Sequence, residues 1–234
     1  MSRHVPLDAT QHRDLRVITA HGLAYGDALM SAVTFPAEFR SLQAHYPIVF
    51  TKTTLGEFLP VALLGLREGE NLFLQGSYWD AHYVPMAIER QPFLIGRDGD
   101  ALSVHIDLDH PRVSSTAGEA LFNAHGGTTP YLERISELLG TLHEGLASVP
   151  AFVEALLRHD LLESFVLDVA EADGGTHRLA GFYTIHEERL AQLAPEALVA
   201  LHRDGLLLPI HMAIASLSQF RGLIARSQRT LRHA

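Results

Sequence analysis

The residues most suited to chemistry form a His-x-Asp pair, His105-Ile-Asp107, inside an apolar stretch of the chain. On a β-strand, side chains two positions apart project from the same face, so this pair is expected to lie side by side. With a distant third histidine, such a pair forms the facial triad that holds non-haem iron in oxygenases. His186 is the candidate for that third ligand, with His177 and His211 as alternatives.

The same stretch has a simpler interpretation, which has the stronger support. Residues 101–109 alternate between an apolar set (Leu102, Val104, Ile106, Leu108) and a polar set (Ser103, His105, Asp107, Asp109). This pattern is typical of a half-buried antiparallel strand whose polar face meets water. The chain also has 15 histidines, so a two-residue motif arises easily by chance. The metal site therefore stays a hypothesis beside the structural alternative.

A second candidate is the aromatic segment 77–85, whose side chains combine apolar bodies with polar tips. Side chains of this kind suit a pocket for a small molecule or an interface with a protein ligand. The predicted ligand-binding residues are Tyr78, Trp79, His82 and Tyr83. The alternative, which we favour, is a structural lid over one end of a sheet, with Trp79 buried in the core.

Two polar loops, at 107–112 and 123–127, are further places where functional residues often lie. Gly126 and Gly127 are not followed by the Lys-Ser/Thr pair of a phosphate-binding loop. The chain also contains no Gly-x-Ser-x-Gly elbow and no dinucleotide fingerprint. Serine hydrolases and nicotinamide dehydrogenases are thereby excluded, and no residue pattern identifies a cofactor.

Composition narrows the class of protein further. The net charge of −9 argues against nucleic acid as a partner, because broad binding to phosphates needs a basic surface. No uninterrupted run of about 20 apolar residues is present, so we expect no transmembrane span. The polar first residues show no signal sequence, and the chain has no cysteine. We expect a cytoplasmic, soluble protein.

The elements that must position these residues begin with a block of strands at 46–108. Five apolar runs are separated by short polar turns, and they lie at 46–51, 59–66, 72–75, 92–97 and 101–108. The turn at 67–71 contains Gly69, and Asp98-Gly-Asp100 is a typical hairpin turn. The pattern predicts one antiparallel meander.

The second half of the chain changes to helical spacing. Thr129 and Pro130 predict a helix start, and two separate helices follow, the second at about 152–161. Further helices are predicted at 187–193, 195–203 and 209–230. A hairpin at 164–183, turning at Glu171–Thr176, is expected to rejoin the first sheet. We predict an N-terminal tail at 1–15 and a single α+β domain at 16–230, with helices packed against a largely antiparallel sheet.

Several segments together resemble the SapC family of bacterial proteins, named after an S-layer-associated protein. They are residues 46–50, 61–73, Trp79, 83–85, 91–93, 181–183 with Glu187, and 201–207. The resemblance covers about residues 16–226, and it brings no established catalytic residue. It implies an aspartate at the position that His186 occupies here.

The resemblance implies an accessory or binding protein linked to the handling of surface-layer or secreted material. The alternative function is a non-haem metal-dependent oxygenase that uses His105, Asp107 and His186. The sequence alone leaves open whether the protein is an enzyme, which ligand it binds and which oligomer it forms.

Overall fold

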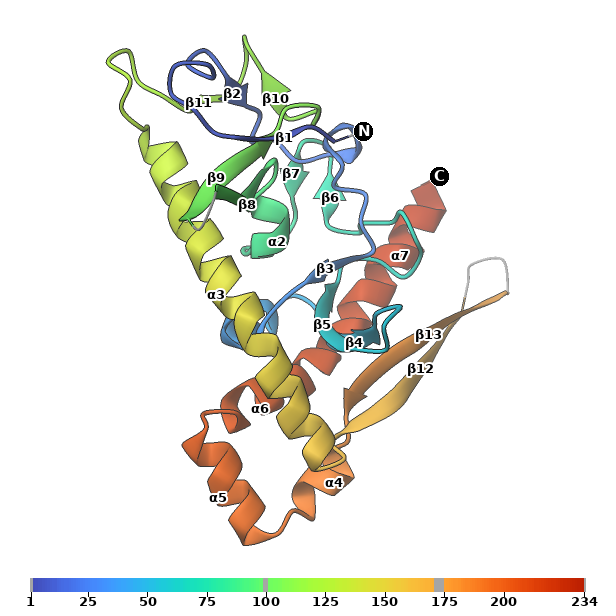
Figure 1. Ribbon diagram of the computed structural model, residues 1–234. Helices are drawn as coiled ribbons and strands as arrows, with labels where there is room; N and C mark the ends of the chain where they lie inside the picture. Colours follow the sequence, from blue (N-terminus) through green and yellow to red (C-terminus); the bar gives the residue numbers. More distant parts are fainter. Residues whose placement is uncertain (1, 99–100, 171–174, 234) are drawn as a thin grey trace. The chain divides into compact units, whose positions relative to one another are not determined.

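The computed structural model describes residues 2–98, 101–170 and 175–233 (Figure 1). The chain divides into two compact units. Unit 1 comprises Met1–Asp27, Leu74–Asp80 and Met86–Glu144, and unit 2 comprises Ala28–Phe73, Ala81–Pro85 and Gly145–Ala234. Each unit combines antiparallel sheet with helix, so the predicted α+β class is confirmed. The single-domain boundaries at 16 and 230 stay a prediction.

Unit 1 contains three small antiparallel sheets, with strand orders β1-β9-β8, β10-β2-β11 and β6-β7. The strands are β1 (His4–Pro6), β2 (Arg16–Val17), β6 (Leu74–Gln75), β7 (Tyr78–Trp79), β8 (Phe93–Asp98), β9 (Ala101–Asp107), β10 (Val113–Ser114) and β11 (Glu119–Ala120). The 3₁₀ turn η1 (Leu23–Tyr25) and helix α2 (Met86–Glu89) also belong to this unit. Strand β1 lies in the segment expected to be a tail, and it pairs with β9 so that His4 opposes Asp107.

The core of unit 1 forms where the apolar face of β8 and β9 meets the first half of helix α3 (Pro130–Arg158). Its buried residues are Val17, Phe93, Ile106, Leu121, Leu132, Ile135 and Leu139. The alternation predicted for residues 101–109 is present in part: Ile106 is buried, but Leu102 is 51% exposed, and the Ser103 Oγ and His105 Nε2 atoms of the polar face are buried and do not meet water. The polar side chains of β9 lie on the strand's other face.

Unit 2 is built on one five-stranded antiparallel sheet with the order β12-β13-β4-β5-β3. Its strands are β3 (Ser31–Val33), β4 (Ile48–Lys52), β5 (Phe58–Leu63), β12 (Leu162–Ala170) and β13 (Thr176–Ile185). The helical elements are η2 (Pro36–Glu38), α1 (Phe39–Leu42), α4 (Glu187–Ala191), α5 (Pro195–Arg203), α6 (Leu207–Ser216), η3 (Leu217–Gln219), α7 (Phe220–His233) and the second half of α3.

Aromatic rings fill the core of unit 2. Phe39 meets Phe152 edge to face with 5.9 Å between ring centroids, and Phe50 stacks on Phe152 at 6.3 Å. Helix α6 is fixed to the sheet by Ser216, whose hydroxyl accepts a hydrogen bond of 2.8 Å from the Ile48 N–H. Since edge-to-face and offset pairs are the favoured aromatic geometries, these contacts stabilise the sheet–helix packing beyond area burial alone.

The meander prediction is wrong in its connectivity. The predicted strands exist, but they are distributed over three sheets, and β5 pairs with β3 and β4 while β6 pairs with β7. In the connector, the Glu70 carboxylate accepts a hydrogen bond of 2.7 Å from the Leu66 N–H, and the Leu72 N–H donates to the Leu64 carbonyl oxygen at 2.8 Å. The two runs are thus held together next to the connector, but β5 and β6 form no continued ladder.

The later hairpin behaves as predicted. Strands β12 and β13 pair with each other, and β13 joins β4 with Phe182 opposite Thr51. The turn residues Gly99 and Asp100, and residues 171–174 of the second turn, lie outside the described residues. The last predicted helix is present as α6 and α7 with the 3₁₀ turn η3 between them.

Helix α3 corrects a second prediction, because the two helices expected at 130–161 are one continuous helix with Pro150 inside it. Thr129 caps its start through a hydrogen bond of 3.3 Å from the Leu132 N–H, as predicted. A proline costs the helix one backbone hydrogen bond. The buried apolar residues Val149, Phe152 and Leu156 continue at helical spacing past the proline, and their packing outweighs that loss.

One helical stretch, Leu207–Thr230, is long and apolar enough to cross a membrane by length and composition, and a third of its most apolar window is buried. A core helix of a soluble protein passes the same test. The expectation that the chain has no transmembrane span stays a prediction.

The chain's single lysine lies on the sheet of unit 2. The Lys52 Nζ atom is 4.7 Å from the ring centroid of Phe58 and 5.1 Å from that of Tyr183. The two rings meet edge to face, with 4.8 Å between their centroids. Both distances are within the range of a cation–π interaction, so the ammonium group is held over the aromatic pair.

Candidate functional site

The most deeply buried charges of unit 1 are Asp27, which is fully buried, and Arg112, which is 3% exposed. The Nη2 atom of Arg112 donates to both carboxylate oxygens of Asp27, at 2.9 and 2.7 Å. The Gly22 N–H donates to the same carboxylate at 2.8 Å. A buried ion pair of this kind is retained only when such hydrogen bonds compensate the loss of hydration.

Arg112 also ties a loop to this carboxylate. Its Nη1 atom donates to the carbonyl oxygens of Ile18 and Ala20, at 2.9 and 2.6 Å. Its guanidinium lies over the Tyr25 ring, 5.4 Å from the centroid. Its Nε atom is buried without a hydrogen-bond partner among the described residues. One side chain thus fixes the loop 18–27 against the segment 107–112 singled out from the sequence.

The Asp27 carboxyl is charged in this setting. Burial alone raises the pKa of Asp27, but hydrogen bonds from His21 and Gly22 and the charge of Arg112 outweigh burial and hold the pKa below its ordinary value. The Nδ1 atom of His21 lies 3.3 Å from Asp27 Oδ2. The His21 ring meets Trp79 edge to face, with 5.2 Å between ring centroids. The predicted residue Trp79 therefore borders this buried network.

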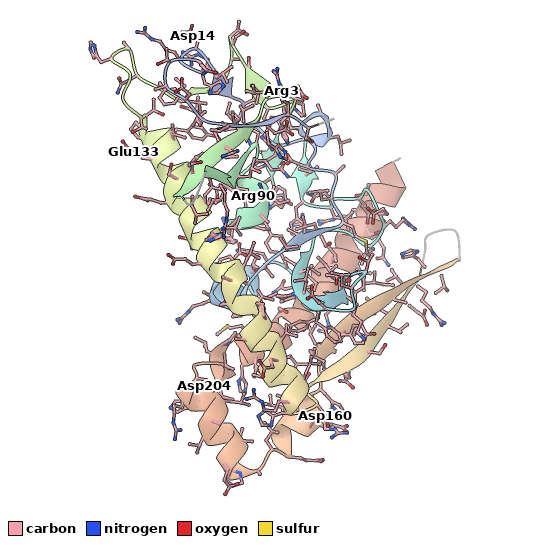
Figure 2. All side chains as sticks on the ribbon, viewed as in Figure 1. Arg3, Asp14, Arg90, Glu133, Asp160 and Asp204 are labelled. Atoms are coloured by element: carbon pink, nitrogen blue, oxygen red, sulfur yellow. The ribbon has the colours of Figure 1, made fainter. Side chains whose placement is uncertain are left out.

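A depression of about 200 Å³ lies beside the network in unit 1. It is lined by His4, Arg90, Gln91, Pro92, Leu94, Asp107 and His110. Among the lining residues, Arg90 is the one labelled in Figure 2, and it directly follows helix α2. His110 connects the depression to the network, because its Nδ1 atom accepts a hydrogen bond of 3.2 Å from the Arg112 N–H.

Two polar groups in the lining have hydrogen-bonding capacity to spare. Among the described residues, Arg90 makes one side-chain hydrogen bond, from Nη1 to the Phe93 carbonyl at 2.6 Å. Burial lowers the pKa of Arg90, yet a guanidinium stays protonated at any physiological pH. The Oε1 atom of Gln91 is buried with no partner in the described part of the chain. Unused buried polar groups are costly unless a water or a ligand satisfies them.

Asp107 supplies the negative charge of the depression. Its Oδ1 atom accepts hydrogen bonds from the backbone N–H groups of Arg3 at 2.9 Å and Asp109 at 3.2 Å. Its Oδ2 atom lies 3.8 Å from His4 Nε2. Burial raises the pKa of Asp107, but these backbone donors outweigh burial, and the net pKa is lower than usual. The side chain is therefore a carboxylate at neutral pH.

His110 is neutral at the same pH. Burial and the nearby Arg112 charge lower the pKa of its imidazole, and the opposing effects of Asp107 and Asp27 are smaller. An imidazole that accepts a hydrogen bond at Nδ1 carries its proton on Nε2. The lining thus places the Arg90 guanidinium and the Asp107 carboxylate in one depression with the neutral His110 and with His4.

The three residues of the metal hypothesis have separate surroundings. The His105 ring packs over Gly96 of the neighbouring strand, and its Nε2 atom is buried without a partner in the described residues. His186 caps helix α4 by accepting a hydrogen bond of 3.4 Å from the Arg189 N–H. Within residues 2–98, 101–170 and 175–233, no group of three His, Asp or Glu side chains could hold a metal ion.

The alternative third ligands have hydrogen bonds of their own. His177 Nε2 lies 2.8 Å from the Leu66 carbonyl oxygen, and His211 Nδ1 lies 2.7 Å from that of Leu207. Of the predicted metal residues, Asp107 is the one that lines the depression.

The four predicted aromatic-segment residues divide between the two units. Tyr78 is 57% exposed and donates to Gln75 at 2.8 Å, while Trp79 is buried in unit 1. His82 and Tyr83 belong to unit 2, where the His82 ring meets His45 at 5.9 Å. The structure therefore assigns the segment to two environments.

Tyr83 contributes to a second buried polar cluster, in unit 2. Its hydroxyl donates to Glu38 Oε1 at 3.0 Å, and its carbonyl oxygen accepts a short hydrogen bond from the Tyr46 hydroxyl. The Thr34 hydroxyl donates to Glu38 Oε2 at 2.6 Å. Glu38 is 2% exposed, so its carboxyl group is held by hydroxyl donors inside the unit.

The sequence missed Asp27, Arg90 and Arg112 as site residues. Asp27 and Arg112 are 85 positions apart, a separation that gives no local motif. The one signal was the polar loop 107–112, which contributes Asp107, His110 and Arg112.

Fold and site together define a mixed α+β protein with a small polar depression supported by a buried ion pair. The model of the SapC family matches residues 7–223, most of the chain, and the chain belongs to the SapC family. No curated protein and no solved structure matches the chain.

Proposed function

We propose that this SapC-family chain is a binding protein whose ligand is a small polar molecule held in the depression between His4 and His110. The observation that carries the proposal is the unused hydrogen-bonding capacity of the Arg90 guanidinium. It presents five N–H donors, and one of its side-chain nitrogens bonds a carbonyl. Gln91, with its unpartnered buried oxygen, lies next to it in the lining. A ligand that accepts from the N–H groups of Arg90 left unused by the protein offsets the cost of those donors.

The surroundings support a preformed site. Asp107 is held by two backbone donors, and His110 is held by the backbone of Arg112, which the buried ion pair fixes in turn. Sites whose polar groups are held in place before binding lose less conformational entropy when the ligand arrives.

The test compares what co-purifies with three proteins: the wild-type chain, Arg90→Gln and Arg13→Gln. Arg13 is the matched control, since it also donates one hydrogen bond of 2.6 Å to a carbonyl, that of Ala124, and lines a different depression of unit 1. We expect a small molecule to be released on denaturation of the wild-type and Arg13→Gln proteins and to be depleted at least about tenfold from Arg90→Gln. Equal yields from all three proteins would contradict the proposal.

The cellular setting is also proposed: a cytoplasmic protein that acts in handling surface or secreted material, as the family resemblance implies. Affinity capture from a native extract, with cell fractionation, tests this setting. Recovery in the membrane or external fraction, or capture of no partner above background, counts against it.

A further inference from the structure

The depression of unit 1 carries one positive and one negative charge on different elements. Arg90 directly follows helix α2, and Asp107 ends strand β9. Among the described residues, Arg90 and Asp107 share neither a hydrogen bond nor an ion pair. Arg90 instead bonds a backbone carbonyl. Asp107 accepts from backbone N–H groups and also interacts with the side chains of Ser2 and His4. Two unlike charges in one small cavity are therefore kept apart and not neutralised by each other.

Apart from two histidines, the rest of the described lining consists of uncharged side chains. His110 is neutral because its surroundings lower its pKa. Pro92 and Leu94 are apolar, and Gln91 contributes an amide. Half-exposed His4 lies at the side of Asp107. A ligand matched to this lining has a negative end, a positive end and a short apolar body.

Size restricts the ligand further. The volume of about 200 Å³ is below the about 300–1,000 Å³ of pockets that take drug-sized molecules. A molecule with a carboxylate, an ammonium group and one to three carbons between and around them is of the right order. Guanidinium binds carboxylates in a fixed fork geometry, and a carboxylate accepts from ammonium in charge-assisted hydrogen bonds.

We propose that the ligand is a small zwitterion of the amino-acid type, with its carboxylate at Arg90 and its ammonium group at Asp107. This inference rests on the binding function proposed above and names the chemical class of that ligand. A simple anion makes no favourable contact with the Asp107 carboxylate, and a simple cation makes none with the Arg90 guanidinium. A zwitterion satisfies both charges at once.

The experiment titrates the wild-type chain with glycine, L-alanine and β-alanine by ligand-observed NMR. Propionate and ethylamine are the matched probes, because each is alanine without one of its two charged groups. We expect at least one zwitterion to bind at least about tenfold more tightly than both single-charge probes. The inference is overturned if propionate or ethylamine binds as tightly as the best zwitterion, or if none of the three zwitterions binds.

Variants of Arg90 and Asp107 test which residue binds the carboxylate of the ligand and which binds its ammonium group. Arg90→Gln should weaken zwitterion and propionate binding alike by about tenfold, whereas Asp107→Asn should weaken zwitterion binding and leave propionate unchanged or tighter. Arg13→Gln should change nothing. If Asp107→Asn does not fold, the comparison of zwitterions with propionate and ethylamine on the wild-type chain still tests the inference. A co-purified molecule that is lost from Arg90→Gln but is not zwitterionic overturns this inference and leaves the binding function standing.

Discussion

Each unit buries a carboxylate next to a residue of the aromatic segment, but the two carboxylates are compensated in different ways. Asp27 of unit 1 is bound by the cation Arg112, and Trp79 lies behind its partner His21. Glu38 of unit 2 accepts hydrogen bonds from the hydroxyls of Thr34 and Tyr83. A cation fixes the charge state of its partner, whereas hydroxyls can serve either a charged or a neutral acceptor. The named donors of the two carboxylates therefore differ in kind: a guanidinium at Asp27 and two hydroxyl groups at Glu38.

The largest expected effect comes from Asp27→Asn. The amide keeps the shape of the side chain, but it leaves the Arg112 guanidinium buried without a counter-charge. We expect the free energy of unfolding to fall by about 3–5 kcal/mol, measured by urea denaturation. Asp14→Asn, at an exposed aspartate of the same unit, is the control and should change the value by less than about 0.5 kcal/mol.

Glu38→Gln is the matched variant in unit 2 and sharpens the comparison. The hydroxyls of Thr34 and Tyr83 can rotate to suit an amide, so we expect a loss of about 1 kcal/mol. A loss as large as that of Asp27→Asn would show that the two hydroxyl donors do not decide how much Glu38 contributes to stability, and the distinction between the two carboxylates would fail. A double variant, Asp27→Asn with Arg112→Gln, should recover part of the loss in unit 1.

A further prediction of intermediate size concerns two glycines of helix α3. A Cβ atom at Gly145 would overlap the buried Phe35 ring, while one at Gly140 meets nothing within 4 Å. Gly145→Ala should cost about 1–3 kcal/mol through overpacking of unit 2, and Gly140→Ala should stabilise the helix by up to about 1 kcal/mol. Equal effects of the two variants, in the same urea assay, would show that the Phe35 packing is absent.

The smallest expected effect is a response to acid in both units. Burial lowers the pKa of His110 in unit 1, with a further contribution from Arg112, and burial followed by the neighbouring His82 lowers that of His45 in unit 2. As the pH falls, these two histidines therefore take up protons in the unfolded chain before they do so in the folded chain. Stability from both groups is complete above about pH 6.5 and is lost as the pH falls through the lowered folded values.

Hydrogen exchange at pH 7.0 and 5.5 measures this response, because peptides from each unit are followed separately. His45→Gln should reduce the acid sensitivity of unit 2 peptides alone, and substitution of the exposed His125 should leave both units unchanged. Identical acid responses in wild type and His45→Gln would remove His45 as the cause.

Local patterns predicted the local elements well. Alternation placed β9 and buried Ile106, and the Thr129 cap with Pro130 placed the start of α3. Strand pairing depended on contacts that no local pattern encodes. The pairing of β3 with β5, in which Ser31 opposes Leu63, joins residues 32 positions apart, and the pairing of β13 with β4 joins residues still farther apart in the chain.

Residues of the proposed site could be marked from the sequence only where an unusual local pattern surrounds them. Asp107 was singled out as part of the His-x-Asp pair and Trp79 as part of the aromatic segment. In the structure, Asp107 lines the depression and Trp79 contacts His21 of the buried network. Arg90 looks like any surface arginine in the sequence, and its role depends on half-burial beside Phe93. Asp27 owes its role to a partner 85 positions away, so no spacing rule finds it.

Lys52 has a practical consequence. Since it is the chain's one lysine, an amine-reactive dye adds a single side-chain label, at the end of β4 in unit 2. Its ammonium lies within about 5 Å of two aromatic centroids, so acylation removes a defined pair of cation–π contacts. The α-amino group reacts with such dyes too, so it must be blocked first. The emission of a dye on Lys52 then reports the local environment of the five-stranded sheet and distinguishes the opening of unit 2 from events in unit 1.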